Sequence, residues 1–472
     1  MEESQGTLSD VPAIGGVIDG FIKHIDSLAD THPVTTKAIE EAIEQSSKET
    51  QALAERYIQL REENQNKAVF AAKLPRDMYQ FTNQYLKLIR RTEKTLLAYN
   101  LVQRSFIISL ISQFDAFLGN LIRALFLIQP ESLNVSERSI TFSQLQEFTS
   151  VDAAKEYIIE KEIDGVLRKS HPEQFDWLEN KFGIKLRDGL KIWPTFIEVT
   201  ERRNLFVHTS GVVTSQYINV CNKHNVDRSD NISIGLELVA SSDYFREAYE
   251  CVFEIGVKLA HILWRKVRPT EREIADRHLN SICYDLLVNE QFKLACILLD
   301  FATTSLRKYA DEQRRRTFII NRAQAYKWIG DFETTQRIIN SEDWSATNDA
   351  FKLARAVILG EFEEANKLVK KIGKGGDVSK NDYRTWPLFR EYRNSQSFIT
   401  TFEEVFEEPL QLMDTELENG LNELDNVTAE FSRLPSGLID LQSIKILDIR
   451  NYTTEADDQS ENEFTPSAQG KE

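Results

Sequence analysis

Four neighbouring residues of this 472-residue chain could act together on a phosphodiester: Arg202, Arg203, Asn204 and His208. An imidazole exchanges protons near neutral pH, so His208 could take the proton from a ribose 2′-hydroxyl and let that oxygen attack the neighbouring phosphorus. A guanidinium stabilises the negative charge that the attacked phosphate gains, which is the role we expect for Arg203. Asn204 could orient the substrate or the histidine, and Arg202 is a supporting residue. This set predicts cleavage of RNA without a metal ion or another cofactor.

The hydrophobic periodicity around these residues predicts a helix from 196 to about 210. On a continuous helix Asn204, His208 and Gly211 lie on one face, because they are spaced i, i+4 and i+7. Arg203 lies about a quarter-turn aside and needs its long side chain to reach that face. Gly211 leaves room beside the histidine for a second backbone, although ending the helix explains a glycine there equally well.

An acidic residue, Asp115, lies in the most apolar helical stretch of the chain, residues 101–128. Its carboxylate could hold Arg203 in place or bias the tautomer of His208. It could equally be an ordinary acid at a helix border, solvated or paired with Arg123. The remaining histidines have no motif partners: His24, His32, His171, His224, His261 and His278.

The heptapeptide RRNLFVH (202–208), with the following TSGV and Tyr217, resembles the R-N-x-x-x-H signature of the HEPN superfamily. The upstream segment SFIISLISQFDAFLGNLIRALF resembles the first core helix of that domain, where an acidic residue often precedes an aromatic one, as Asp115 precedes Phe117 here. The likeness covers residues 101–264. It implies an all-helical bundle of which two copies pair, so that both motifs line one cleft. We therefore expect a homodimer with a composite site.

The resemblance also implies an activity, that of a metal-independent endoribonuclease that cuts RNA by 2′-hydroxyl attack and leaves a cyclic phosphate. It implies a setting in prokaryotic antiviral defence, stress response or a toxin–antitoxin pair, with tRNA or another cellular RNA as the substrate and no DNA. The main alternative is a catalytically inactive HEPN bundle that serves, with the C-terminal repeats, as an interaction subunit of a larger complex. A nucleotide-binding regulatory module without turnover is a third interpretation.

Helical periodicity runs through almost the whole chain, so we expect an all-α protein. A first long helix, capped by Thr35 or Thr36, follows the His32-Pro33 pair and runs to about residue 69. A second covers 77–100, and the irregular pattern at 212–238 indicates a loop. We divide the chain into an N-terminal helical extension at 1–95 with a disordered start at 1–12, a HEPN-like domain at 96–268, tetratricopeptide-like repeats at 269–409, and an acidic C-terminal region at 410–472 that is disordered from about 452.

Three similar stretches support the repeats: EQF before Ala295, GDFE, and GEFE before Ala365. Their phenylalanines, Phe292, Phe332 and Phe362, are 40 and 30 residues apart and bracket the 34-residue period of tetratricopeptide repeats. The surrounding segments resemble helix pairs of that family, in which small residues permit close packing: Ala323, Ala325, Ala354 and Ala356. The resemblance implies a partner protein at these repeats.

Composition limits the location and the partners. The net charge of −17 opposes a polyanion, so contact with RNA must come from a local basic patch. The runs 314–316 and 265–268 could supply one, or could be solvated faces. The four scattered cysteines indicate reduced thiols, not a zinc site or a disulfide framework. We see no apolar run long enough for a membrane and no signal peptide, and we expect a cytoplasmic protein.

Overall fold

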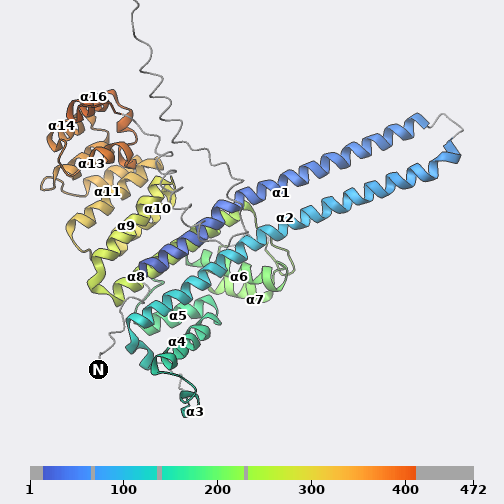
Figure 1. The fold of residues 1–472 in the computed structure, drawn as a ribbon, viewed down its shortest axis with the longest axis horizontal. Coiled ribbons are helices and arrows are strands. Elements are labelled where there is room, and N and C mark those ends of the chain that lie inside the picture. Colours follow the sequence, from blue (N-terminus) through green and yellow to red (C-terminus); the bar gives the residue numbers. More distant parts are fainter. Residues whose placement is uncertain (1–13, 65–69, 136–140, 228–231, 411–472) are drawn as a thin grey trace, which may run out of the picture. The chain divides into compact units, whose positions relative to one another are not determined.

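The computed structural model describes residues 14–64, 70–135, 141–227 and 232–410 (Figure 1). Its architecture is all-α, which confirms the expected class. The chain divides into two compact units, Met1–Leu368 and Val369–Glu472. The segments expected to be disordered, 1–12 and from about 452, lie outside the described residues. The four-part division at 95, 268 and 409 stays a prediction.

The first unit begins with a long antiparallel helical hairpin (Figure 1). Its two helices are α1 (Ile14–Asn64) and α2 (Phe70–Ile128). The expectation that the first helix starts at residue 35 or 36 is wrong, because α1 runs through Pro33. The adjacent His32 is buried, stacks on the ring of Phe245, and places its Nε2 2.6 Å from Gln103 Oε1. These tertiary contacts keep the helix continuous although Pro33 donates no backbone hydrogen bond.

Helix α2 is the central element of the first unit's core. It is continuous, whereas the sequence indicates separate helices at 77–100 and 101–128. Its C-terminal half has fully buried apolar side chains at Ile107, Leu110, Ile111, Phe114, Leu118, Leu121, Ile122 and Leu125. By length and composition alone, the part Asn83–Ile128 is apolar enough to cross a membrane, contrary to our expectation. Half of its 18-residue apolar stretch is buried inside the protein.

The N-terminal turns of α1 pack against helix α8 (Ser242–Val267), which lies far away in the sequence. The apolar residues of α1 that are buried in the core are Ile14, Ile18, Phe21 and Ile25. The Tyr249 hydroxyl donates a hydrogen bond of 2.6 Å to Asp26 across 223 residues of sequence. A Cβ atom on Gly256 would overlap the ring of Phe21, so a glycine permits this close approach.

The helices between α2 and α8 carry most of the candidate site residues. They are α3 (Phe142–Leu145), α4 (Val151–Leu167), α5 (His171–Phe182), α6 (Trp193–His208) and α7 (Ser215–Lys223), preceded by the 3₁₀ turn η1 (Pro130–Val135). Helix α7 contradicts the loop expected at 212–238. Thr214 caps it by accepting the backbone N–H of Tyr217, and Val212 forms an isolated antiparallel bridge with Glu237.

Six consecutive helices follow α8 and the turn η2 (Pro269–Glu271). They are α9 (Arg272–Val288), α10 (Phe292–Asp300), α11 (Glu312–Trp328), α12 (Phe332–Asn340), α13 (Asp349–Leu359) and α14 (Phe362–Ile372), with the π turn η3 (Phe301–Ser305) after α10. Each recurring phenylalanine begins a helix, but Phe332 is 60% exposed. Four alanines of α11 and α13 are buried instead: Ala323, Ala325, Ala354 and Ala356. Small side chains therefore make the close contacts in this region.

The second unit is small and aromatic. Its described elements after α14 are α15 (Lys380–Thr385), η4 (Pro387–Phe389), η5 (Tyr392–Asn394) and α16 (Gln396–Phe406). Its core is a cluster of mutually tilted rings with almost no exposed surface: Tyr383, Phe389, Tyr392, Phe398 and Phe402.

Candidate functional site

Helix α6 carries the motif and ends within it. Its N-terminal half is anchored by Phe196 and Ile197, which have no exposed surface. The helix ends at His208, because Ser210 and Gly211 adopt left-handed backbone angles with φ of 53° and 87°. The N–H of Gly211 donates to the carbonyl of Leu205, which closes the last turn.

Gly211 therefore lies outside the helix and does not continue the face of Asn204 and His208. A Cβ atom at this glycine would lie 2.8 Å from the carbonyl oxygen of Leu238, and the N–H of Leu238 donates to the carbonyl of Gly211. Both explanations of the glycine hold at once: it terminates the helix, and it admits a second backbone. That second backbone belongs to the same chain.

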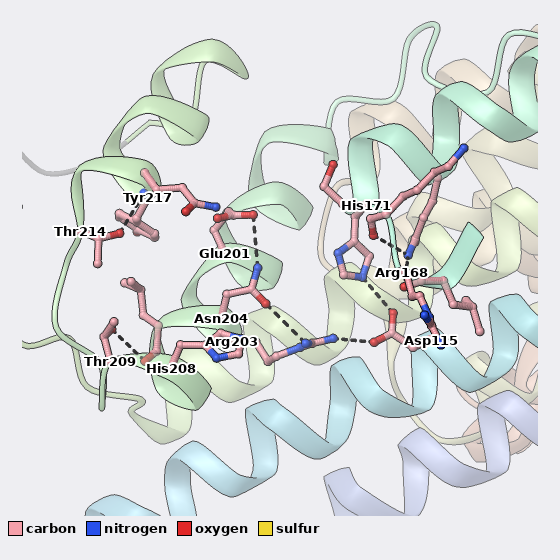
Figure 2. A pocket seen from close by; sticks show the side chains of 16 residues that line it. Asp115, Arg168, His171, Glu201, Arg203, Asn204, His208, Thr209, Thr214 and Tyr217 are labelled. Carbon is pink, nitrogen blue, oxygen red and sulfur yellow. Dashed lines mark hydrogen bonds and ion pairs between the residues drawn. The ribbon is translucent and has the colours of Figure 1, made fainter. Parts of the chain in front are cut away.

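Arg203, Asn204, His208 and Asp115 all line one open pocket of about 380 Å³ (Figure 2). Asp115 comes from α2, and the motif residues come from α6. The side chain of Arg203 is 20% exposed, whereas His208 is exposed at the end of its helix. The pocket thus contains a proton-transfer group, a fixed cation and an amide, and a ligand can enter it from solvent.

Asp115 makes two contacts at the base of this pocket. Its Oδ2 accepts a hydrogen bond of 2.5 Å from Nη2 of Arg203, and its Oδ1 lies 3.0 Å from Nε2 of His171 (Figure 2). Arg123, the other partner considered for Asp115, pairs instead with Glu156 and Glu160. The carboxylate therefore orients the guanidinium, because a charge-assisted hydrogen bond is both short and directional.

The chain of contacts continues beyond Arg203. Its Nη1 donates to Oδ1 of Asn204 at 3.4 Å, and Nδ2 of Asn204 donates to Oε1 of Glu201 at the same distance. Glu201 is 8% exposed, and burial raises the pKa of its carboxyl group, while the charge of His171, the Asn204 amide and Arg203 oppose this rise. Five polar side chains from α2, α5 and α6 thus form one hydrogen-bonded series along the pocket.

The sequence reasoning missed two members of this series, His171 and Glu201. The sequence spacing could have identified Glu201, because Glu201, Asn204 and His208 are spaced i, i+3 and i+7 and share one helical face. His171 follows Ser170, which forms a capping box with Glu173 at the start of α5. That pattern predicts where the helix begins, but its docking against α2 is a tertiary contact that the local sequence does not encode.

Arg202 turns away from the pocket into a buried polar cluster. Its Nε donates to Oε1 of Glu198 at 2.7 Å, and its guanidinium lies 4.0 Å from the centre of the Tyr244 ring. Glu198 also accepts hydrogen bonds of 2.8 Å from the hydroxyls of Tyr217 and Tyr244. Burial, followed by the Glu198 charge, raises the pKa of both phenols, so they remain donors. Arg202 thus connects α6 to α8, and it does not line the pocket.

Positive charge is in excess at the rim. Arg168 and Lys169, at the end of α4, line the pocket and are exposed. Within the ranges that the structure describes, neither side chain has an ion-pair partner, whereas Arg203 is matched by Asp115. An anionic ligand would therefore meet two cations at the entrance that no close ion pair neutralises.

Comparison of the chain with protein-family models, with curated proteins and with solved structures gives no match. Any functional assignment must therefore rest on the side chains of this pocket and on their surroundings.

Proposed function

We propose that this chain is a metal-independent endoribonuclease of the HEPN type. The observation that carries the proposal is the convergence of His208, Arg203 and Asn204 on one solvent-open pocket with a positively charged rim. His208 removes the proton from a ribose 2′-hydroxyl, and the bond between that oxygen and phosphorus forms while the bond from phosphorus to the 5′-oxygen breaks. The products are a 2′,3′-cyclic phosphate and a 5′-hydroxyl, which receives its proton from an imidazolium.

Arg203 stabilises the phosphate as negative charge accumulates on its oxygens. The hydrogen bond to Asp115 fixes the guanidinium before the substrate arrives, so that little reorganisation is needed during the reaction. Asp115 engages Nη2, and the second N–H of that nitrogen together with one on Nη1 can donate to phosphate oxygens. His171 holds the other oxygen of Asp115 and is a positioning residue.

We further propose that the site is completed by a second copy of the chain. The attacking and leaving oxygens lie on opposite sides of phosphorus, so separate imidazoles serve best as base and acid. The surface next to His208 favours such pairing, because apolar side chains are exposed there: Val207 at 47%, Val212 at 37%, Leu236 at 41% and Val239 at 57%. Burial of this patch would also help to hold a dimer together.

The finer fold follows from the same proposal. Helices α2 and α4–α8 correspond to a HEPN-like bundle, with α1 and the first part of α2 as its extension, and α9–α14 correspond to a tetratricopeptide-like stack. Exposed apolar residues at the turns of these repeats, Val288, Ile329 and Phe332, favour a bound partner protein. They also support the alternative function, a catalytically inactive interaction subunit. The cytoplasm of a prokaryote, in defence or stress response, is the proposed setting.

The test is the incubation of purified protein with a structured RNA in the presence of EDTA. We expect cleavage with cyclic-phosphate ends, its loss in His208→Ala, and unchanged activity in His24→Ala, a control that removes an exposed imidazole from α1. If the wild type and His208→Ala are equally inert on several RNAs, the scaffold alternative replaces the nuclease. Light scattering that shows a monomer at micromolar concentration would contradict the composite site.

A further inference from the structure

Helix α2 carries a second feature, a row of four basic residues well before Asp115. Lys87, Arg90, Arg91 and Lys94 are spaced i, i+3, i+4 and i+7, so they share one face of the helix. All four side chains are exposed. Neither the motif nor the pocket around it uses these residues.

The basic row forms one wall of a groove of about 600 Å³ between the two helices of the hairpin. Apolar side chains of α1, two of them alanines, form the other wall: Ala38, Ile39 and Ala42. Thr95 and Ala98 of α2 complete the lining, and none of these described lining residues is acidic. We call this feature the hairpin groove. Small residues on the α1 side leave the cations accessible to a bulky ligand.

The charges in the hairpin groove are largely uncompensated. Arg91 lies 3.7 Å from Glu49, with 66% of its own side chain exposed, which makes a weak surface pair. Within the described ranges, Lys87, Arg90 and Lys94 have no acidic partner. The basic runs singled out from the sequence differ, since the arginines at 314–316, Arg265 and Arg268 are all ion-paired.

We propose that the hairpin groove binds the phosphate backbone of the RNA substrate, an inference that rests on the proposed function. In a chain with a net charge of −17, a polyanion binds only where cations are concentrated and unpaired. A groove with one cationic wall and one apolar wall can hold a strand through its phosphates without reading its bases. The groove therefore supplies affinity, and the pocket at His208 supplies chemistry.

The distance between the hairpin groove and the pocket determines how long an RNA must be to contact both. Lys94 precedes Asp115 by 21 residues on one uninterrupted helix, which is about 32 Å at 1.5 Å per residue. At 3.6 residues per turn, the two residues point within about 60° of each other around the helix axis. A structured RNA can contact both sites at once, whereas an oligonucleotide of about four nucleotides cannot.

The experiment measures RNA binding in the His208→Ala background, where the RNA stays intact. The triple variant Lys87→Gln, Arg90→Gln, Lys94→Gln is compared with a control that removes the same charge from exposed residues elsewhere: Lys185→Gln, Arg246→Gln, Arg277→Gln. For a long structured RNA at about 0.1 M salt, we expect the groove variant to raise Kd by a factor between 10 and about 100, and to lower the log–log salt slope by about 2. The short oligonucleotide should bind equally to both variants.

The outcomes separate the two proposals. Equal Kd values and salt slopes for the groove variant and the control would overturn the groove assignment and leave the nuclease proposal intact. If the wild type cleaves no RNA but long RNA still needs the groove, the groove stands and the nuclease fails. Competition by polyglutamate as strong as that by RNA would overturn the assignment to RNA, because it would show a preference for acidic proteins.

Discussion

The contact between Asp115 and Arg203 gives the sharpest test of the site, through the substitution Asp115→Asn. Asparagine has the same shape, but it removes the negative charge that faces both Arg203 and His171. The side chains of Asp115 and Arg203 are 27% and 20% exposed, so solvent screens the pair only in part. A hydrogen bond to a charged group contributes about 1.5–3 kcal/mol, and loss of one partner of a fully buried pair costs about 3–5 kcal/mol.

For this partly exposed pair we expect the free energy of unfolding to fall by about 1–2 kcal/mol, because the amide oxygen can still accept one of the two hydrogen bonds. The effect on catalysis should be larger. A guanidinium that is no longer fixed loses part of its preorganisation, which predicts a decrease in kcat/KM of about 10- to 100-fold. Asp164→Asn, which alters an exposed acid on α4, is the matched control and should change neither quantity.

A double-mutant cycle with Arg203→Gln separates this coupling from general damage. If Asp115 acts through Arg203, the losses in the double variant are smaller than the sum of the single losses by about 1 kcal/mol. The readouts are urea unfolding and kcat/KM for RNA cleavage. The positioning role of Asp115 would be refuted by two results together. The losses in unfolding free energy and in kcat/KM would each be additive within about 0.3 kcal/mol, and the activity of Asp115→Asn would lie within twofold of the wild type.

Two further predictions follow from buried groups. Glu198→Gln should lower the free energy of unfolding by about 3–5 kcal/mol in urea, since it leaves Arg202 buried without its carboxylate; a loss below about 1 kcal/mol would show that the cluster is not structural. Burial, and then the charges of Arg265 and His278, lower the pKa of His261, so below about pH 6.5 the unfolded chain binds a proton that the folded chain does not. Between pH 6.5 and 5.5 the wild type should therefore lose about 1 kcal/mol more stability than His261→Gln, and identical pH profiles would contradict this.

Local pattern predicts the helices well where apolar spacing is regular and caps are clear. Helix α8 begins next to its Ser241 cap and ends at Val267, just before the position between 268 and 269 where we divide the chain. Pro33 led to the wrong predicted start of the first helix, because a proline normally marks a helix start. Here the packing of His32 keeps α1 continuous through Pro33. Tertiary contacts outweigh local preference at this point.

In the candidate site, too, some residues can be predicted from the local sequence and others depend on tertiary contacts. Arg203, Asn204 and His208 are found from their types and spacing, and Asp115 from its place in an apolar helix. His171 is not, because its contact with Asp115 depends on the docking of α5 on α2 across 56 residues of sequence. The opposite direction of Arg202 depends on Glu198, which lies four residues earlier on the same helix, and on Tyr244 of α8, which is a tertiary neighbour. Residue identity predicts chemistry, but packing decides which of two adjacent arginines lines the pocket.

The packing of α1 against α8 has a consequence for synthesis on the ribosome. The apolar stripe of α1 is synthesised before α8, and Tyr249, which donates a hydrogen bond to Asp26, follows that residue by 223 positions. At about 5–20 residues per second, that delay lasts roughly 11–45 s. During this interval α2 can cover its side of α1, as the stacking of Phe21 on Phe117 shows, but the side that packs on α8 stays exposed. A product truncated before α8 therefore leaves that side of its first helix uncovered.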